Sequence, residues 1–232
     1  MGKRELKNKK TESAIHDRFI ILTGLILTAM EIWKQLTLWL VEFGGKYNVW
    51  YFPFQLCSMP IYITILYGFL MGFKKSKRVD PDSVKKILLT FLQDYGFLGG
   101  VMSLIVHDGL IHPGYVLLTL HGFVWHILLV ILSLYISINR LSLPGWRGFL
   151  KTVPLFGSFA FLAELINVLL HKYGDCDMFY ISPYHISSQP VFSYIDMIAG
   201  RGTGIAVYLC SVIIGALFMH MFLENANKLL TI

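Results

Sequence analysis

The sequence predicts an all-α fold: a polytopic bundle of six transmembrane helices with both chain termini in the cytoplasm. Hydrophobic residues make up 55% of the 232 positions and charged residues only 15%, which is typical of a chain that crosses a membrane several times. Six apolar segments are each about as long as the roughly 20 residues that a helix needs to span a bilayer. The Lys and Arg residues are also strongly biased towards alternate connections between these segments.

The first apolar segment, 18–40, follows a basic tail at 1–17. The tail and the apolar run together resemble a signal peptide, but no small-residue cleavage site follows the run. We therefore expect a retained first span. Residues 18–232 form one transmembrane domain in this interpretation.

The second segment, 49–73, carries a cysteine between two prolines. We expect a helix in which Pro53 occupies the first turn, where a missing N–H has little effect. Pro60 would fall inside the helix and could not donate to the carbonyl of Leu56, so we expect a kink beside Cys57. The alternative is that Cys57 is a small buried side chain next to a tolerated kink.

The remaining spans are expected at 84–106, 116–138, 149–170 and 203–222. They must be helical, because lipid offers no partners to unpaired backbone groups. The connections are short except for the last, 172–202, which is rich in aromatic residues and contains Pro183 and Pro190. We expect this outer loop to fold over the bundle as a lid.

The positive charges give the orientation of the bundle. Sixteen of the 20 Lys and Arg residues lie in 3–18, 74–86, 140–151 or at Lys228, which alternate spans place on one side. That side is the cytoplasm by the positive-inside rule. The net charge of +6 is explained by this bias, and no nucleic-acid partner is expected. We expect a multi-pass protein of the plasma membrane.

Polar side chains collect at one depth, in the outer half of the predicted bundle. Ionisable residues in a membrane are costly, usually face the bundle interior and usually mark function. They predict a polar cavity that opens towards the outer leaflet or the outer solvent. The alternative is a set of hydrogen bonds that merely holds the helices together. The residues are Glu31, Gln55, Cys57, Asp94, His121, His126, Glu164 and Asn167.

A cysteine and a histidine at that depth could move acyl chains between lipids. The thiolate is the nucleophile, so a thiol in apolar surroundings needs a base, and the base needs a group that orients it. Cys57, a histidine of the fourth span and either Glu164 or Asn167 would supply the three. His121 and His126 are five positions apart and project roughly 140° apart on a helix. Only one of them can therefore face Cys57.

Two other functions remain open from the residues. A non-catalytic protein could bind or transport a lipid or a small polar ligand in the same cavity. A zinc hydrolase could use three of the histidines that lie outside the membrane or in its outer half, although no pair has the i, i+4 spacing of a helical zinc motif. The three cysteines form no disulfide framework and no Cys-rich metal pattern. The acyl-transfer hypothesis needs no cofactor.

Several short motifs resemble one known family. Their order along the chain is similar to that in YwaF-type bacterial integral membrane proteins, which in turn resemble a mammalian transmembrane enzyme that transfers arachidonoyl chains onto lyso ether phospholipids. The motifs are Phe54-Gln-Leu-Cys-Ser, Leu120-His-Gly-Phe-Val-Trp, Asn167 and Asp177-Met-Phe-Tyr. Two departures from the family pattern are Phe52-Pro53, where a Leu-Pro pair is usual, and Asp175-Cys-Asp-Met-Phe-Tyr, where the family has Asn-Tyr-Met-Tyr.

The resemblance implies particular roles for two residues. Cys57 matches the cysteine that carries the acyl chain, and His121 matches the histidine that precedes glycine, which favours His121 over His126 as the base. The resemblance also implies membrane phospholipids or lysophospholipids as partners. It fixes neither the acyl donor nor the choice between transfer to a lysolipid and hydrolysis.

Overall fold

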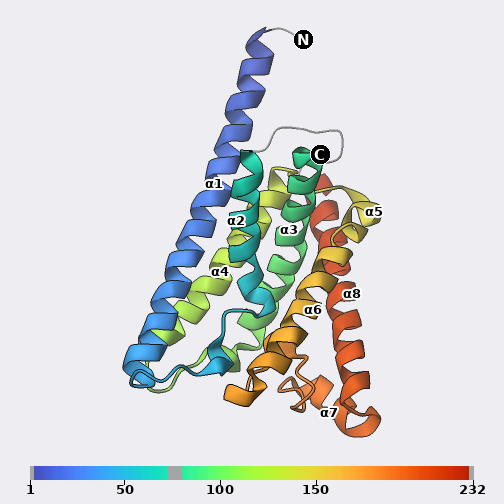
Figure 1. Cartoon of the computed structure of the whole chain (residues 1–232). Coiled ribbons are helices and arrows are strands. Elements are labelled where there is room, and N and C mark those ends of the chain that lie inside the picture. The colour runs from blue at the N-terminus through green and yellow to red at the C-terminus, as the bar shows by residue number, and fades with distance from the viewer. Residues whose placement is uncertain (1–2, 73–79, 230–232) are drawn as a thin grey trace.

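The computed structural model describes residues 3–72 and 80–229 and consists of packed helices (Figure 1). Within those ranges there is no strand, and the fold is 81% helical. The all-α prediction is therefore confirmed. The eight α-helices of these ranges are α1 (Lys3–Leu36), α2 (Met59–Met71), α3 (Pro81–Ile105), α4 (Val116–Ile138), α5 (Gly145–Leu150), α6 (Val153–Leu170), α7 (Pro190–Ala199) and α8 (Arg201–Leu229).

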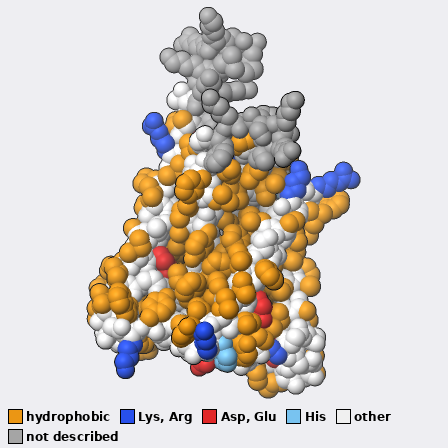
Figure 2. Space-filling model, in the orientation of Figure 1, with side chains coloured by type: hydrophobic (Ala, Val, Ile, Leu, Met, Phe, Trp, Pro, Cys, Tyr) orange, Lys and Arg blue, Asp and Glu red, His pale blue; other side chains and the backbone are white. Residues whose placement is uncertain are grey.

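Among the described residues, five segments are long and apolar enough to cross a membrane: Thr11–Glu42, Pro81–Ile105, Val116–Ile138, Gly145–Tyr173 and Arg201–Leu229. The remaining predicted span, the second along the chain at 49–73, corresponds to a shorter apolar stretch, Leu56–Met71. The first span begins inside α1, which continues as a π-helix over Thr37–Glu42. Figure 2 shows hydrophobic side chains over most of one face, with described Lys and Arg side chains near its two ends. This surface fits a protein embedded in lipid.

The second segment differs most from its prediction. Regular helix begins at Met59, with Pro60 in its first turn, and not at Val49. Cys57 lies in a 3-10 turn, Leu56–Ser58, that precedes the helix. The predicted kink is therefore wrong, because a proline in the first turn interrupts no helical hydrogen bond. Pro53 lies in the irregular chain before this turn, and not in the helix.

Helix α3 forms the centre of the bundle and packs against α2, α4 and α8. Of its apolar window, 56% is buried, against 22–39% for the other four long spans. Small residues allow the close contacts. A Cβ added to Gly100 would lie 2.9 Å from the Val130 side chain and 3.1 Å from the carbonyl oxygen of His126 on α4, and short approaches of this kind are typical of membrane helices.

The segment between α6 and α8 has structure of its own. It contains two 3-10 turns, His171–Tyr173 and Met178–Tyr180, followed by α7, which packs against α8. In Figure 1 this segment lies at the end of the bundle opposite the C-terminus. The predicted long loop at 172–202 is therefore a folded cap on that end.

Candidate active site

Cys57 lies where three helices meet. Its partly buried side chain packs in a cluster formed by Leu27 of α1, Ile61 of α2 and Trp125 of α4. The indole Nε1–H of Trp125 donates a hydrogen bond of 3.1 Å to the carbonyl oxygen of Cys57. Because α2 begins two residues later, Cys57 lies at the N-terminal end of a helix. The helix dipole there favours negative charge on the sulfur, while burial opposes it.

His121 lies against the same tryptophan. Its ring stacks on Trp125 and on Trp33, with 5.6 Å between ring centroids in each pair. Its Nε2 lies 3.1 Å from the carbonyl oxygen of Met30. A carbonyl oxygen can only accept a hydrogen bond, so Nε2 carries the hydrogen. The other nitrogen, Nδ1, then has a free lone pair and is the one that can act as a base.

The second histidine of α4 has the opposite tautomer. The Nδ1 of His126 donates to the carbonyl oxygen of Gly122, one turn earlier on its own helix, at 2.7 Å. The hydrogen therefore lies on Nδ1 of His126, and Nε2 carries the lone pair. Both histidines are buried. Only His121 stacks on the indole that holds Cys57.

A charged pair from α1 completes this side of the site. Oε1 of Glu31 accepts from Lys34 and from Gln35, each at 2.8 Å. Glu31 is only 6% exposed, and its Oε2 has no hydrogen-bond partner within the described part of the chain. Both Glu31 and Lys34 lie within electrostatic range of Cys57 and of His121. The sequence placed Glu31 in the cavity lining but missed Lys34 as its partner.

The structure thus brings Cys57, His121 and Glu31 to one place. Across the described residues no hydrogen bond joins the Cys57 sulfur to either histidine of α4. Catalytic hydrogen bonds are often long or poorly aligned without substrate and tighten when it binds. Trp125 contacts both Cys57 and His121. It is the last residue of the motif Leu120-His-Gly-Phe-Val-Trp, but no role for it was predicted.

Asn167 and Gln55 make their contacts elsewhere. The Asn167 amide binds the backbone of Met178 in both directions, accepting from its N–H at 2.6 Å and donating to its oxygen at 3.1 Å. The Gln55 amide donates to the oxygen of Asp177 at 2.7 Å and accepts from the N–H of Phe179 at 2.8 Å. Neither hydrogen-bonds to His121. The two amides instead hold residues 177–179 of the cap against α6 and against the turn of Cys57.

Glu164 lies one turn before Asn167 on α6 and belongs to the same region. Asn167, Arg201 and Asp177 lie within range of its carboxyl group, while His121 is not among its partners. Its Oε2 is buried and has no hydrogen-bond partner in the described ranges. The structure therefore does not bring the two predicted orienting residues, Glu164 and Asn167, to the predicted base.

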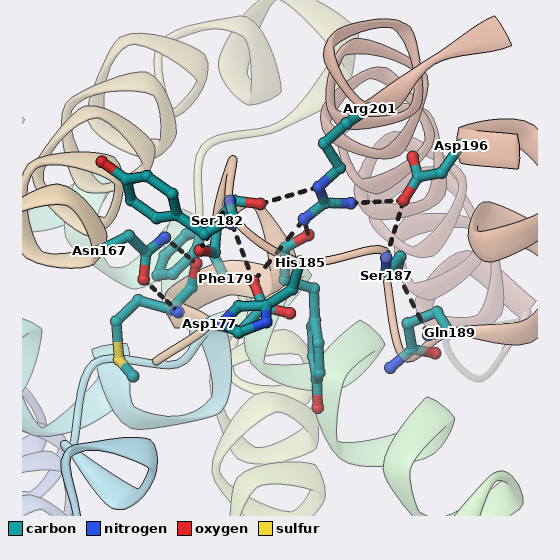
Figure 3. Close-up of polar contacts among 12 residues, drawn as sticks. Asn167, Asp177, Phe179, Ser182, His185, Ser187, Gln189, Asp196 and Arg201 are labelled. Carbon is teal, nitrogen blue, oxygen red and sulfur yellow. Dashed lines mark hydrogen bonds and ion pairs between the residues drawn. The ribbon is translucent and has the colours of Figure 1, made fainter. Parts of the chain in front are cut away.

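Arg201 fastens the cap from its other side (Figure 3). Its guanidinium forms an ion pair of 2.8 Å with Asp196 and donates to the carbonyl oxygens of Ser182 and Tyr180. Phe179 and Tyr180 both have left-handed backbone angles, with φ of 58° and 57°. Such angles are uncommon for aromatic residues and need the surrounding bonds to hold them.

Tyr180 of the cap lies within electrostatic range of Cys57, and its ring packs edge-on against Tyr208 of α8. Burial, together with Cys57 and Asp177 nearby, raises the pKa of Tyr180 to about 12. The phenol is therefore neutral at physiological pH and keeps its hydrogen for donation. The sequence did not predict this aromatic residue of the cap so near the candidate site.

Asp94 does not join this group. It is fully buried, and its carboxylate lies 2.9 Å from Nδ1 of His220 on α8. Gln93 donates to the same carboxylate at 2.9 Å. The sequence missed His220, although a histidine inside a predicted span is itself a signal of function. Asp94 and His220 form a second polar centre.

The zinc alternative has no ligand set in the described ranges, where no three His, Cys, Asp or Glu side chains cluster closely enough to hold a metal ion.

Comparison with known proteins gives one match. The model of the TMEM164 family matches residues 1–223. No curated protein and no solved structure matches.

Proposed function

The chain belongs to the TMEM164 family, and from this premise we propose that it is a multi-pass membrane acyltransferase of lipids. Cys57 carries the acyl chain as a thioester in this proposal, and His121 moves the proton. The enzyme acts on membrane phospholipids or lysophospholipids. The likeness of its motifs to YwaF-type bacterial proteins supports the same function.

The contacts of Trp125 are the main support for this proposal. Trp125 donates to the carbonyl of Cys57 and stacks on the ring of His121, so one rigid side chain sets the position of the nucleophile and of the base. The Met30 carbonyl leaves Nδ1 of His121 with a lone pair. Glu31 is adjacent to Met30 and stabilises the imidazolium that forms when this nitrogen takes a proton.

Cys57 and His121 together can account for every proton and every bond that moves in the reaction. Nδ1 of His121 takes the proton of the Cys57 thiol, and the thiolate attacks the ester carbonyl of the acyl donor. The ester C–O bond breaks, a thioester forms and the departing alcohol takes the proton from His121. A lysolipid hydroxyl then gives its proton to His121 and attacks the thioester carbonyl. The C–S bond breaks, the new ester forms and the Cys57 thiolate takes the proton back from His121. Water in place of the hydroxyl would give hydrolysis.

A lipid could reach this site from the side of the bundle. Trp33, which stacks on His121, is 39% exposed, and Leu120 and Val124, which flank His121 along α4, are exposed as well. An apolar surface next to the site would be covered by acyl chains in a bilayer. This arrangement supports a substrate that arrives within the membrane.

We also propose six spans with both termini in the cytoplasm, in the plasma membrane. In this proposal the stretch Leu56–Met71 is the second span along the chain and is added to the five long apolar segments. At about 1.5 Å per residue it is shorter than the roughly 30 Å hydrocarbon core. The irregular chain before it is supported where it packs on other elements, as non-helical backbone at membrane depth must be.

A non-catalytic lipid-binding or transport function is the alternative. It would need the polar residues but no reactive thiol. A thiol-reactive acyl phosphate probe distinguishes the two, since only the enzyme should label selectively at Cys57. Labelling at Cys57 that is no faster than at the exposed Cys210 would favour the binding function.

The test of the enzyme proposal is the purified Cys57→Ala protein in phospholipid vesicles that contain a lysophospholipid acceptor. We expect acyl transfer to fall to the background rate, because the Cys57 sulfur forms the thioester in this mechanism and Ala has no nucleophile. Cys210→Ala is the matched control, because that cysteine is exposed on α8. Unchanged transfer by Cys57→Ala would contradict the mechanism, provided that the variant elutes as the folded protein.

A further inference from the structure

A cavity lies between α3, α4 and α8, beside α5, at the end of the bundle where Figure 1 shows the C-terminus. Its volume is about 340 Å³, which is within the range of small-ligand sites. The cavity is lined by Gln93, Ser137, Arg140, Ser142, Leu143, Pro144, His220, Glu224, Asn227 and Lys228. It shares no residue with the neighbourhood of Cys57 and is therefore a separate site.

Two side chains of the lining are almost fully buried, and each has one polar atom without a partner. His220 of α8 is 1% exposed, and its Nδ1 donates to the Asp94 carboxylate at 2.9 Å, while its Nε2 has no hydrogen bond in the described ranges. Nε2 lies 4.0 Å from Oε2 of Glu224, too far for a hydrogen bond. Gln93 of α3 is 2% exposed and donates to Asp94 at 2.9 Å, while its Oε1 has no hydrogen bond in those ranges either.

The charged side chains of the lining already have interactions within the protein. Glu224 pairs with Lys228 at 3.1 Å and accepts from a backbone N–H at 2.9 Å. Arg140 has an interaction of its own as well. The amide of Asn227 donates to the carbonyl oxygen and to the hydroxyl of Ser137, at 2.7 and 2.8 Å. A neutral ligand therefore suits this lining better than an ion does.

The two unpartnered atoms favour a ligand that donates hydrogen bonds. Buried polar atoms of this kind cost roughly 1–3 kcal/mol each when unsatisfied, and they are expected to have a partner, in water or in a ligand. Oε1 of Gln93 can only accept a hydrogen bond. Because Nδ1 of His220 carries a hydrogen, Nε2 has the lone pair in the neutral ring and accepts as well. Two acceptors need two donated hydrogens, and a single hydroxyl group has only one.

The lining is apolar as well as polar, which favours a ligand with carbon atoms over water alone. Leu143 and Pro144 belong to the lining, whereas an ordered water needs two to four polar partners. A molecule with several hydroxyls on a short carbon chain suits both parts of the cavity. Its hydroxyls can donate to Gln93 and His220, and its C–H groups can contact the apolar side chains.

We propose that this cavity binds a neutral polyol of the glycerol type, either a soluble molecule or the headgroup of an acylglycerol. One hydroxyl donates to Oε1 of Gln93 and another to Nε2 of His220. If the histidine ring takes a second proton, the second hydroxyl accepts from Nε2 instead. Binding here involves no group of the Cys57 site. With the orientation proposed above, the cavity faces the cytoplasm.

The experiment measures binding of tritiated monooleoylglycerol and of tritiated glycerol to the immobilised full-length protein by scintillation proximity. The buffer holds no glycerol, and the detergent is dodecyldimethylamine oxide, which has no hydroxyl to compete for the cavity. We expect saturable binding that methyl oleate and propan-1-ol, which are not polyols, do not displace. Binding of glycerol indicates that a soluble polyol suffices, and binding of monooleoylglycerol alone indicates a lipid headgroup.

His220→Asn tests the polar end of the cavity. The Asn amide nitrogen can take the place of Nδ1 and donate to Asp94, but nothing replaces Nε2. We expect binding to weaken at least tenfold. His126→Asn is the matched control, because that buried histidine also donates through Nδ1 and does not line the cavity. It should leave binding unchanged.

Ser142→Phe tests the cavity without altering the two buried side chains. A phenyl group at this lining position occupies the space of the ligand, so we expect binding to weaken at least tenfold. Ser158→Phe is its control, because that exposed serine of α6 does not line the cavity. If His220→Asn does not elute as the folded protein, Ser142→Phe decides.

Four results would each overturn the polyol site. Neither probe binds saturably, so that the cavity holds water only; methyl oleate and propan-1-ol displace the probes as well as the polyols do; a folded His220→Asn or Ser142→Phe protein binds as tightly as the unmodified one; or the two control variants weaken binding equally. Unchanged binding by His220→Asn and Ser142→Phe would place the bound polyol elsewhere in the protein.

Discussion

The side chain of Trp125 illustrates how residue-level contacts set the chemistry that the candidate site can perform. Its indole contacts both a backbone carbonyl and an imidazole ring. Removing it would disturb the cysteine and the histidine together. Single-residue tests therefore need substitutions that keep the local hydrogen bonds and remove only the basic nitrogen.

His121→Gln is such a substitution. The Gln amide nitrogen can take the place of Nε2 and donate to the Met30 carbonyl, but nothing replaces the lone pair of Nδ1. We expect acyl transfer to fall at least 100-fold, at the low end of the range for general acid–base catalysis. The measurement is the initial rate of lysophospholipid acylation per folded molecule.

His126→Asn is the control for that experiment. The Asn amide nitrogen can replace Nδ1 and donate to the Gly122 carbonyl, so the helix keeps its local contact. We expect its transfer rate to stay within a few-fold of that of the unmodified protein. A large loss in His126→Asn together with a small loss in His121→Gln would assign the base to His126.

Among the secondary-structure elements, the residue at which α2 begins determines the surroundings of Cys57. Because regular helix begins at Met59, Cys57 lies in a turn whose carbonyl remains available to Trp125. Gln55, two residues earlier, ties that turn to the cap. The segment before the helix therefore joins the cap to the candidate site, which a helix continuous from Val49 would not do.

Asn167→Ala tests whether this residue holds the cap or orients the base. The substitution leaves both the N–H and the carbonyl oxygen of Met178 without their partner in a buried place. We expect a loss of stability of at least about 2 kcal/mol. For a protein of this size it corresponds to a Tm lower by roughly 4–8 °C, measured by thermal unfolding in detergent.

Asn139→Ala is the matched control, since that exposed asparagine bonds only to its own helix among the described contacts. It should leave the Tm within about a degree. A role of Asn167 in orienting His121 would instead give an unchanged Tm with a large loss of acyl transfer. That outcome would contradict the function of Asn167 in holding the cap.

For the whole molecule, the decisive question is whether Leu56–Met71 crosses the membrane. With six spans the N- and C-termini lie on one side, and with five they lie on opposite sides. In a bacterial host we expect a fluorescent protein fused after Ile232 to fluoresce. We expect alkaline phosphatase fused after Tyr173 to be active, because this places it outside. Active phosphatase after Ile232 would contradict the six-span topology.

Much of the fold could be predicted because lipid constrains it strongly. A long apolar stretch in a bilayer must form a helix, since its backbone has no other partners. The prediction 116–138 matches α4 at both ends, and 84–106 differs from α3 by a few residues. The second segment failed because its apolar run also covers an irregular stretch that packs on the protein. Hydropathy cannot distinguish that packing from lipid contact.

The candidate site could be predicted only in part. Cys57, His121 and Glu31 were expected in one cavity, and the structure brings them together. Asp94 was expected with them but pairs with His220, because depth in the membrane does not say which neighbour a side chain faces. Asn167 was expected to orient the base, yet the cap, whose path the sequence did not reveal, takes both of its polar atoms.

The sequence by itself determined that this protein is a bundle of membrane helices, which side chains are costly in lipid and where the positive charges lie. These follow from the solvent, because each helix meets the bilayer on its own. Only the tertiary structure decided which polar groups meet, which tautomer His121 adopts and how the cap is held. Those depend on the rotation of each helix about its axis and on contacts between residues far apart in the chain.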